Sequence, residues 1–554
     1  MDRETRAFAE SHFRRLRGRP AGGAGATPGR VDFIESPDSF SYADFFKGYL
    51  LPNVPCVFSS SFTEGWGSRR RWVTPGGKPA FEHLLRNYGD VVVPVANCGV
   101  QEYNSNPKEH MLLRDYISYW EDYIQGGYSS PRGCLYLKDW HLCSCAAVPA
   151  QGRSDAPRLP QALHHPALLT HVLGRLPSKA VPDLCSISIT DQRLACPVQG
   201  RLLWFDHTLL PPWELQRRPS GTCLTLVGSH TPSALFPCSE GVLGCCVRSP
   251  TQQCAGHKQR PTYSHPNHLV QGTEDASAED VFTLPVYFSS DWLNEYWDAL
   301  DVDDYRFIYM GPAGTWSPFH ADIFRSFSWS VNICGRKKWF FFPPGQEEAL
   351  RDCHGALPYD VTSPALLDSR LYPMRKHCSP PLELTQEAGE MVFVPSGWHH
   401  QVHNLEDTIS INHNWVNGCN LASMWHFLQQ ELRAVQREVS QWRDTMPDWD
   451  RHCQVIMRSC SGINFEEFYH FLKIIAERRL LLLAKEMGPG DMEGSAGSGL
   501  GPQQAAFDVS RIAEVLASVV AHPDFQRVDA SVFSLQPGEL LQQLEEVVAA
   551  TASL

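Results

Sequence analysis

Apolar and polar residues alternate with a period of two through the middle of the chain. The alternation is clear at 305–310, and the aromatic run 338–342 and the segment 391–415 are also strand-like. This period is typical of β-strands, whose successive side chains point to opposite faces. A loop-rich stretch with one short expected helix, at 346–351, interrupts the pattern over 345–390. The pattern predicts a mainly β central domain.

After Asn420 the period changes to that of an α-helix. Apolar side chains recur every three or four residues, which is the spacing of one buried helical face. Helices are expected at 421–442 and 465–485, within a C-terminal helical part spanning 421–487. A Gly- and Ser-rich linker is expected at 488–504. The terminal segment 505–554 is expected to be helical at 507–522 and 538–550, with a weaker attachment to the core.

The first 143 residues begin with a polar segment, and helix-like and strand-like periods both occur after it. Residues 1–30 are Arg-rich and then Gly-, Ala- and Pro-rich, so they are expected to be a flexible leader. Residues 31–143 predict an α+β unit, and 107–110 is interpreted as a solvated turn. Helices are expected at 41–51, 81–88 and 112–123, and strands at 54–58, 91–95 and 135–137.

Residues 144–276 differ from everything around them. They contain 15 of the 41 prolines, no clear hydrophobic period, and the adjacent pair Cys245 and Cys246. A structureless loop of this length is improbable inside a compact domain. We therefore expect an atypical, disordered insert, of the kind that translated non-coding sequence would give. Its His and Cys residues match no zinc-finger spacing.

Composition narrows the class of protein. The chain has 554 residues, of which 43% are hydrophobic, and a net charge of -13. The acidic balance argues against direct nucleic-acid binding. Its 18 cysteines form no zinc-type pairs, and the charged start and the lack of a long apolar run predict neither a signal peptide nor a membrane span. We expect the cytoplasm, with the nucleus as the alternative; composition does not indicate an oligomeric state.

Two short stretches carry residues that could bind a metal ion. His320 and Asp322 are two apart in a strand-like segment, so their side chains can share a face. A third ligand can come from the later run 392–400, where His399 and His400 are candidates, with His403 shortly after. Two histidines and one carboxylate that leave open positions are the ligand set of non-haem Fe(II) oxygenases.

The surrounding motifs resemble the jumonji-C family of 2-oxoglutarate oxygenases. They are Phe-Ile-Tyr-Met-Gly-Pro from Phe307, Ser-Pro-Phe-His-Ala-Asp from Ser317, Gly-Arg-Lys-Lys-Trp from Gly335, and Pro-Ser-Gly-Trp-His-His from Pro395. The resemblance covers 30–143 and 279 to about 545. It implies a double-stranded β-helix, the cupin-like jelly-roll barrel of that family, with its core at 277–420. An α+β flank would precede the barrel and helices would follow it.

The resemblance also implies roles for individual residues. Its pattern places the third iron ligand five residues after Pro395, at His400, although His399 stands where an aromatic residue is usual. Iron(II) would thus be held by His320, Asp322 and His400. The distal carboxylate of 2-oxoglutarate would be bound by Lys337, rather than by its neighbour Lys338. Supporting contacts are implied at Tyr136, at Ser317 (where Thr is commoner) and, with less support, at Asn412.

The implied activity is Fe(II)-, 2-oxoglutarate- and O2-dependent hydroxylation of a protein. Three phrases resemble a family member that hydroxylates a lysine of the eukaryotic translation release factor, which implies a role in translation termination. They are Tyr-Leu-Lys-Asp-Trp-His from Tyr136, Ser-Pro-Phe-His-Ala-Asp from Ser317 and Ser-Ile-Asn-His-Asn-Trp from Ser410. Two alternatives remain open. One is a protein-lysine demethylase, which would use the same cofactors on an N-methyl group. The other is an inactive isoform disrupted by the insert.

Overall fold

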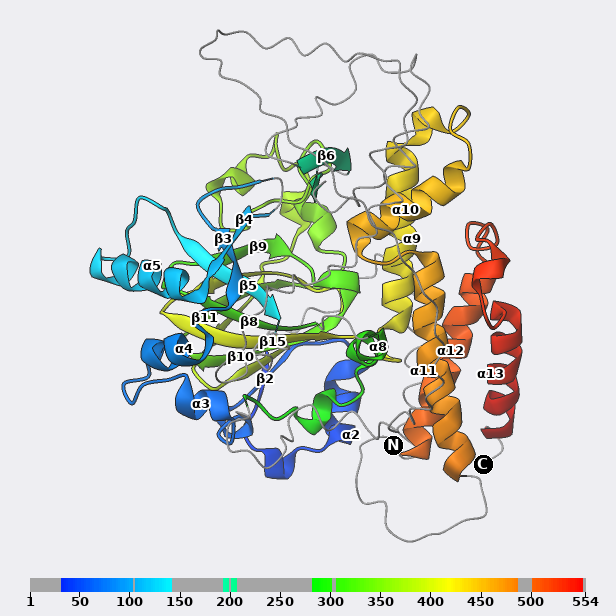
Figure 1. The fold of residues 1–554 in the computed structure, drawn as a ribbon, viewed down its shortest axis with the longest axis horizontal. Coiled ribbons are helices and arrows are strands. Elements are labelled where there is room, and N and C mark those ends of the chain that lie inside the picture. The colour runs from blue at the N-terminus through cyan, green and yellow to red at the C-terminus, as the bar shows by residue number, and fades with distance from the viewer. Residues whose placement is uncertain are drawn as a thin grey trace, which may run out of the picture.

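The computed structural model describes residues 31–102, 105–141, 193–198, 201–206, 281–300, 305–486 and 501–551. It is a mixed α and β structure with two mainly antiparallel sheets on one side and a group of helices on the other (Figure 1). The leader expected at 1–30 lies outside the described residues. So does most of 144–276, although Arg193–Val198 (β6) and Arg201–Asp206 (β7) pair there as an antiparallel hairpin.

The larger sheet has nine strands and combines the N-terminal unit with the central domain. Its order is β1-β2-β13-β10-β15-β8-β5-β3-β4, and all pairs but β1–β2 are antiparallel. Strand β5 pairs with β8 although the insert separates them in sequence. The strands are β1 (Asp32–Ile34), β2 (Cys56–Phe58), β3 (Val92–Asn97), β4 (Lys108–Leu112), β5 (Leu135–His141), β8 (Arg306–Gly311), β10 (Phe327–Cys334), β13 (Met391–Val394) and β15 (Thr408–Trp415).

The smaller sheet has four strands in the order β12-β11-β14-β9. They are β9 (Trp316–His320), β11 (Lys337–Phe342), β12 (Leu382–Gln386) and β14 (His399–Asn404), all in antiparallel pairs. Apolar side chains from both sheets form one shared cluster, which includes Val392 from the larger sheet and Trp339 and Val402 from the smaller one. This contact places the two sheets against each other.

The two faces of the larger sheet differ in chemistry. In β10, Trp329 and Val331 belong to an aromatic core shared with the N-terminal helices, whereas the alternate residues Ser328 and Ser330 are polar and also buried. Strand β15 repeats this arrangement, with Ile411 in that core and Ser410 on the alternate face. Buried polar groups need partners or a ligand. The polar face is therefore where a site is expected.

The N-terminal helices cover the apolar face. They are α2 (Tyr42–Phe45), which continues as a π-helical turn at Phe46–Leu50, α3 (Gly67–Arg71), α4 (Phe81–Tyr88) and α5 (Leu113–Gln125). Helices α4 and α5 closely match the helices expected at 81–88 and 112–123. The expected turn at 107–110 is wrong, because Lys108 to His110 belong to edge strand β4, whose exposed residues pair with β3.

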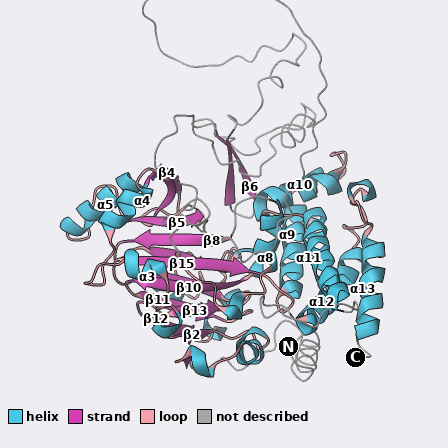
Figure 2. Ribbon diagram, turned by 60° about the horizontal axis from the view of Figure 1, so that its bottom comes forward, coloured by secondary structure: helices cyan, strands magenta, loops and turns pink. Residues whose placement is uncertain are grey.

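The C-terminal helices pack beside the sheets (Figure 2). They share one apolar cluster with α8 (Trp292–Leu300) and comprise α9 (Leu421–Glu438), α10 (Trp449–Ser461), α11 (Phe465–Glu486), α12 (Pro502–Val520) and α13 (Pro537–Thr551). Helix α10 was not expected from the sequence. The expected weak attachment of the last segment is also wrong for α12, since Phe507, Ile512 and Leu516 are buried. Among the described residues, no helix is long and apolar enough to cross a bilayer.

A buried ion network joins three of these helices. Arg479 of α11, 2% exposed, donates to Asp508 of α12 at 2.8 Å and to Glu295 of α8 at 2.8 and 3.0 Å. Removing one partner of such a network leaves a charge buried without compensation. We expect Arg479→Ala to lower the free energy of unfolding by about 3–5 kcal/mol, measured by urea denaturation.

The adjacent Arg478 is the matched control for this prediction. It also contacts Glu295, at 3.2 Å, but its side chain is 40% exposed. Exposed ion pairs contribute about 0–1 kcal/mol. Equal decreases in the free energy of unfolding for Arg478→Ala and Arg479→Ala would contradict a stabilising role specific to the buried ion network.

Candidate metal centre

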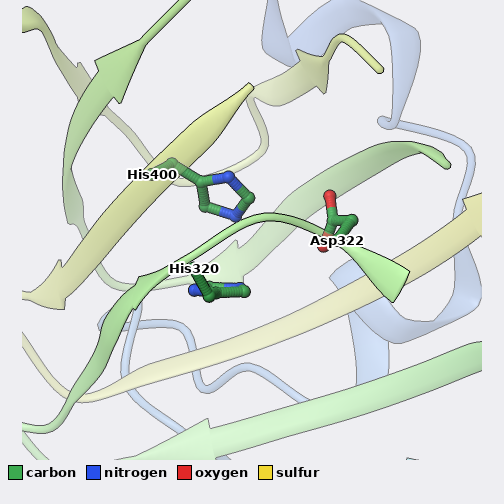
Figure 3. Close-up of side chains that lie close together, drawn as sticks. All are labelled: His320, Asp322 and His400. Carbon is green, nitrogen blue, oxygen red and sulfur yellow. The ribbon is translucent and has the colours of Figure 1, made fainter. Parts of the chain in front are cut away.

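Two neighbouring strands of the smaller sheet bring His320 and His400 together. His320 ends β9 and is directly opposite His400 of β14 in the antiparallel register. Their ring centroids are 4.4 Å apart. With Asp322 they form the only group of three potential metal ligands found among the described residues, with ligand atoms within 4.8 Å of one another (Figure 3). The structure therefore brings together the three residues selected from the sequence.

Asp322 reaches this group from a turn and not from the strand. Strand β9 ends at His320, and Asp322 precedes the short 3-10 turn Ile323–Arg325. The expectation that one strand presents both side chains is therefore wrong. Phe324 and Arg325 both have φ of 55°, which is unfavourable for residues other than glycine. This sharp turn redirects the chain from β9 into β10.

Contacts on both sides of the turn hold its conformation. The Phe324 ring is fully buried in the C-terminal helical cluster. The carbonyl of Arg325 accepts a hydrogen bond of 2.6 Å from the Ser396 hydroxyl, at the start of the segment that leads to His400. The Oγ of Ser328 donates to Oδ2 of Asp322 at 2.6 Å. The helices and the larger sheet thus both fix the position of the carboxylate.

Hydrogen bonds orient both histidine rings. Nδ1 of His320 lies 2.7 Å from the carbonyl of Pro318, and Nδ1 of His400 lies 3.1 Å from that of Trp398. A carbonyl only accepts, so each Nδ1 carries a hydrogen, and Nε2 is the nitrogen that has the lone pair in the neutral ring. Burial, followed by the neighbouring His400, lowers the pKa of His320 to about 4. A neutral imidazole with a free Nε2 is the form that binds a metal ion.

The two rival histidines are engaged elsewhere. His399 faces Arg325 and Glu347, with Nε2 at 3.3 Å from the guanidinium and Nδ1 at 3.8 Å from the carboxylate. His403 stacks on Trp316 with ring centroids 5.3 Å apart and planes within 2°. Neither belongs to the group that includes His320 and Asp322. Of the three candidates in this run, geometry selects His400.

Lys337 and Lys338 point to opposite environments. Lys337 is 2% exposed, and its ammonium donates to the Ser410 hydroxyl at 2.7 Å. Lys338 is partly exposed and pairs with Glu383 at 2.7 Å. Burial, followed by repulsion from Lys138, lowers the pKa of Lys337 to about 7. A buried cation without an anionic partner among the described side chains suits an anionic ligand.

The other predicted contacts lie on strands around this lysine. Asn412 donates to the same Ser410 hydroxyl at 3.2 Å. Tyr136 is buried on β5, and burial raises the pKa of its hydroxyl despite a hydrogen bond with Asn404. Ser317 is buried on β9 opposite Val402. Ser317 pairs with Val402 and His320 with His400, so β9 advances three residues over a distance in which β14 advances two. This β-bulge lets the side chains of Ser317 and His320 both face the site.

Comparison with known proteins identifies the class. Residues 307–415 match the family model described as the JmjC domain, a hydroxylase. The chain is 59% identical to the human 2-oxoglutarate and iron-dependent oxygenase JMJD4, over 100% of both chains. The chain belongs to the JmjC oxygenase family. The zebrafish JMJD4 is 42% identical over 94% of this chain and 92% of its own, and the Arabidopsis arginine-specific demethylase JMJ20 is 27% identical over 82% and 72%.

As a JmjC protein, the chain is a 2-oxoglutarate and iron-dependent oxygenase. The cluster fits a non-haem iron ion, because it offers two imidazoles and one carboxylate, whose ligand atoms all lie within 4.8 Å of one another. Lys337 fits the distal carboxylate of 2-oxoglutarate, since it supplies a buried cation. The side chains present therefore suit the iron ion and the 2-oxoglutarate that the family uses.

Sequence reasoning missed three side chains of this JmjC site. Lys138 is close enough to lower the pKa of both Lys337 and His320, although its effect on each is smaller than that of burial. The Tyr309 hydroxyl donates to Asp139 at 2.5 Å, and Ser328 holds Asp322. The alternation of β8 and β10 could have indicated Tyr309 and Ser328. Nothing local marks Lys138, which precedes the left-handed residue Asp139 at an irregularity of β5.

The Ser328 contact gives a prediction for metal affinity. Groups that hydrogen-bond to a metal ligand typically change affinity by about 10- to 100-fold when they are removed. We expect Ser328→Ala to weaken iron(II) binding by that amount, measured anaerobically by titration calorimetry. Ser330→Ala is the matched control, because Ser330 lies two residues along β10 and its hydroxyl makes no hydrogen bond in the structure. Equal effects of the two changes would sink the assignment.

Proposed function

We propose that His320, Asp322 and His400 bind the catalytic iron(II) and that Lys337 binds the distal carboxylate of 2-oxoglutarate. The convergence of the three potential ligands is the observation that carries this proposal. When bound, iron and 2-oxoglutarate together activate O2 to oxidise a C–H bond of the substrate. The protein supplies two imidazole nitrogens and one carboxylate oxygen, in orientations fixed by the carbonyls of Pro318 and Trp398 and by Ser328.

The co-substrate would lie between the two sheets. Lys337 would neutralise the distal carboxylate, with Ser410 and Asn412 keeping the ammonium in place. Tyr136 and Ser317 would contribute hydroxyl contacts from β5 and β9. Trp339 and Val402, which belong to the apolar cluster between the sheets, would help to exclude water. We further propose that the two sheets are the two halves of the family's double-stranded β-helix.

We propose that the substrate is a protein, and that the reaction is hydroxylation of a lysine of the eukaryotic translation release factor in the cytoplasm. The resemblance of the phrases from Tyr136, Ser317 and Ser410 to a hydroxylase of that factor supports the substrate. Free buried thiols such as Cys56, Cys98 and Cys334 suit a reducing compartment.

Mass spectrometry of the release factor tests this proposal. The full chain is incubated with iron(II), 2-oxoglutarate, O2 and purified release factor, with His320→Ala as the control. We expect one added oxygen on a lysine with the native enzyme and none with the variant. Turnover of 2-oxoglutarate without any oxygen on the factor would refute the substrate while leaving the oxygenase intact.

N-demethylation is the second candidate reaction. It is favoured by the likeness to the Arabidopsis relative named an arginine-specific demethylase. Oxidation of an N-methyl group releases formaldehyde, whereas hydroxylation of a lysine side-chain carbon does not. Formaldehyde release from methylated peptides, absent with His320→Ala, would favour this reaction.

Deletion of the insert, residues 144–276, tests the alternative that the chain is an inactive isoform. An inactive isoform would require that residues 144–276 separate Tyr136 from the site. Against this, β5 pairs with β8 through Leu137 and Met310, directly beside Tyr136. We therefore expect the full chain and a variant lacking 144–276 to show similar turnover. Activity found only after the deletion would establish the inactive alternative.

A further inference from the structure

Two cysteines face each other at the end of the β3–β5 pair. The register of these strands pairs Ala96 with Tyr136 and Asn97 with Leu135. The next step places Cys98 opposite Cys134, and the backbone N–H of Cys98 donates to the carbonyl of Cys134 at 2.8 Å. Directly opposed, hydrogen-bonded residues of antiparallel strands have Cα atoms about 5.5 Å apart. Disulfides usually span Cα distances of about 4.4–6.8 Å.

The two thiols differ in reactivity. Cys98 is buried, whereas Cys134 is partly exposed. The contact with the Cys98 thiol, and further that with Tyr123, lowers the pKa of the Cys134 thiol to about 7, although burial opposes this. The pKa of Cys98 is raised, first by the same contact with Cys134 and then by burial. The accessible cysteine is therefore the one that more readily forms the thiolate, which is the reactive species.

The pair is connected to the catalytic residues from two directions. Cys134 is two residues before Tyr136 on the same chain segment. The thiol of Cys98 donates at 3.4 Å to the carbonyl of Trp316, the first residue of β9, which also carries Ser317 and His320. A change at the two sulfurs thus acts on both β5 and β9.

We propose that Cys98 and Cys134 are a peroxide-reactive dithiol that forms a reversible disulfide and thereby lowers the activity of the oxygenase. The Cys134 thiolate attacks hydrogen peroxide, which forms a sulfenic acid and releases water after proton transfer. The Cys98 sulfur then attacks that sulfur, expels a second water and completes the S–S bond. Overall, two thiols are oxidised by two electrons and one peroxide is reduced to two waters.

The disulfide removes the hydrogen that Cys98 donates to Trp316. The start of β9 loses that contact, and the new bond draws β3 and β5 together beside Tyr136. We expect the KM for 2-oxoglutarate to rise and its turnover to fall severalfold, with recovery after reduction by dithiothreitol. This inference concerns the oxygenase itself and is independent of the identity of its protein substrate.

Peptide mapping tests the proposal without relying on activity. The metal-free full chain is treated with equimolar hydrogen peroxide, alkylated, digested without reductant and analysed by mass spectrometry. We expect a peptide linked through Cys98 and Cys134, two hydrogens lighter than the sum of its parts and cleaved by dithiothreitol. The lone buried thiol of Cys334 is the internal control and should remain reduced.

Variants and kinetics complete the test. Cys98→Ser should leave Cys134 as a sulfenic or higher acid, and Cys134→Ser should leave Cys98 as a thiol. After reloading with iron, the oxidised native enzyme should show the KM increase, and Cys134→Ser should show none. Recovery of both thiols unmodified from the native chain would overturn the dithiol. A linked peptide with unchanged kinetics would overturn its effect on activity.

Discussion

Asp322→Ala is expected to abolish 2-oxoglutarate turnover and to weaken iron(II) binding at least about 100-fold, since even partners of metal ligands contribute 10- to 100-fold. The variant loses the only carboxylate in the three-residue group of potential ligands found in the described chain. Only the two imidazoles would remain, and they carry no negative charge to compensate that of a divalent cation. The removed atoms also leave the Ser328 hydroxyl without its acceptor.

Two measurements check the Asp322 prediction. Succinate formation reports turnover, and anaerobic calorimetry with iron(II) reports the affinity of the site. Asp360→Ala is a suitable control, because Asp360 is a carboxylate that accepts from Gln401 of β14 at 2.7 Å but lies outside the ligand group. Native-like iron affinity in Asp322→Ala would show that another residue completes the site.

The three residues that meet could be selected from the sequence, because His320 and Asp322 form a recognisable His-x-Asp pair and the resemblance to the jumonji-C family places the third ligand at His400. Alternation along β10 and β15 separates apolar residues from the polar ones that face the site. The His-x-Asp spacing and the later histidines then identify the potential ligands. The resemblance selects Lys337 rather than Lys338, and strand geometry explains why only one of them can face the site, since neighbours in a strand face opposite sides. The structure has Lys337 buried and Lys338 paired near the surface.

The geometry that completes the site could not be predicted in this way. Asp322 lies at a turn with two left-handed residues, and that turn depends on the burial of Phe324 in a cluster of helices that are distant in sequence, most of them in the C-terminal part of the chain. The shift in β9 that places Ser317 and His320 on one side depends on pairing with β14. Such features arise from tertiary packing, which overrides local preference. Helix α10 was missed for a similar reason, because it buries few residues and buries them by packing against α9.

Replacement of Lys337 is the second change with a large expected effect. If Lys337 pairs with the distal carboxylate of 2-oxoglutarate, Lys337→Met removes one partner of a buried charge pair, at a cost of about 2–5 kcal/mol. This cost corresponds to an increase of about 30- to 5000-fold in the dissociation constant of 2-oxoglutarate. Lys338→Met, the neighbouring exposed lysine, should leave the dissociation constant nearly unchanged. Equal effects of the two substitutions would reject the assignment.

The pH dependence of 2-oxoglutarate binding distinguishes a charge pair from simple packing. Without co-substrate, burial and the nearby Lys138 lower the pKa of Lys337 from the ordinary lysine value of 10.5 to about 7. The unfolded chain therefore binds more protons than the folded one between these values, so Lys337 penalises the folded state at and below pH 7. That penalty disappears as the pH rises toward 10.5.

Binding of 2-oxoglutarate should show the opposite trend, because the dianion requires the charged ammonium. Above pH 7 the free enzyme must take up a proton when it binds, so affinity should fall by up to about tenfold per pH unit. Calorimetry between pH 7 and 9, in buffers of different ionisation enthalpy, would detect both the fall and the proton uptake. Lys337→Met should bind weakly and lose this dependence. A fall in affinity that persists unchanged in Lys337→Met would instead place the titrating group elsewhere, with Lys138 as the first residue to test.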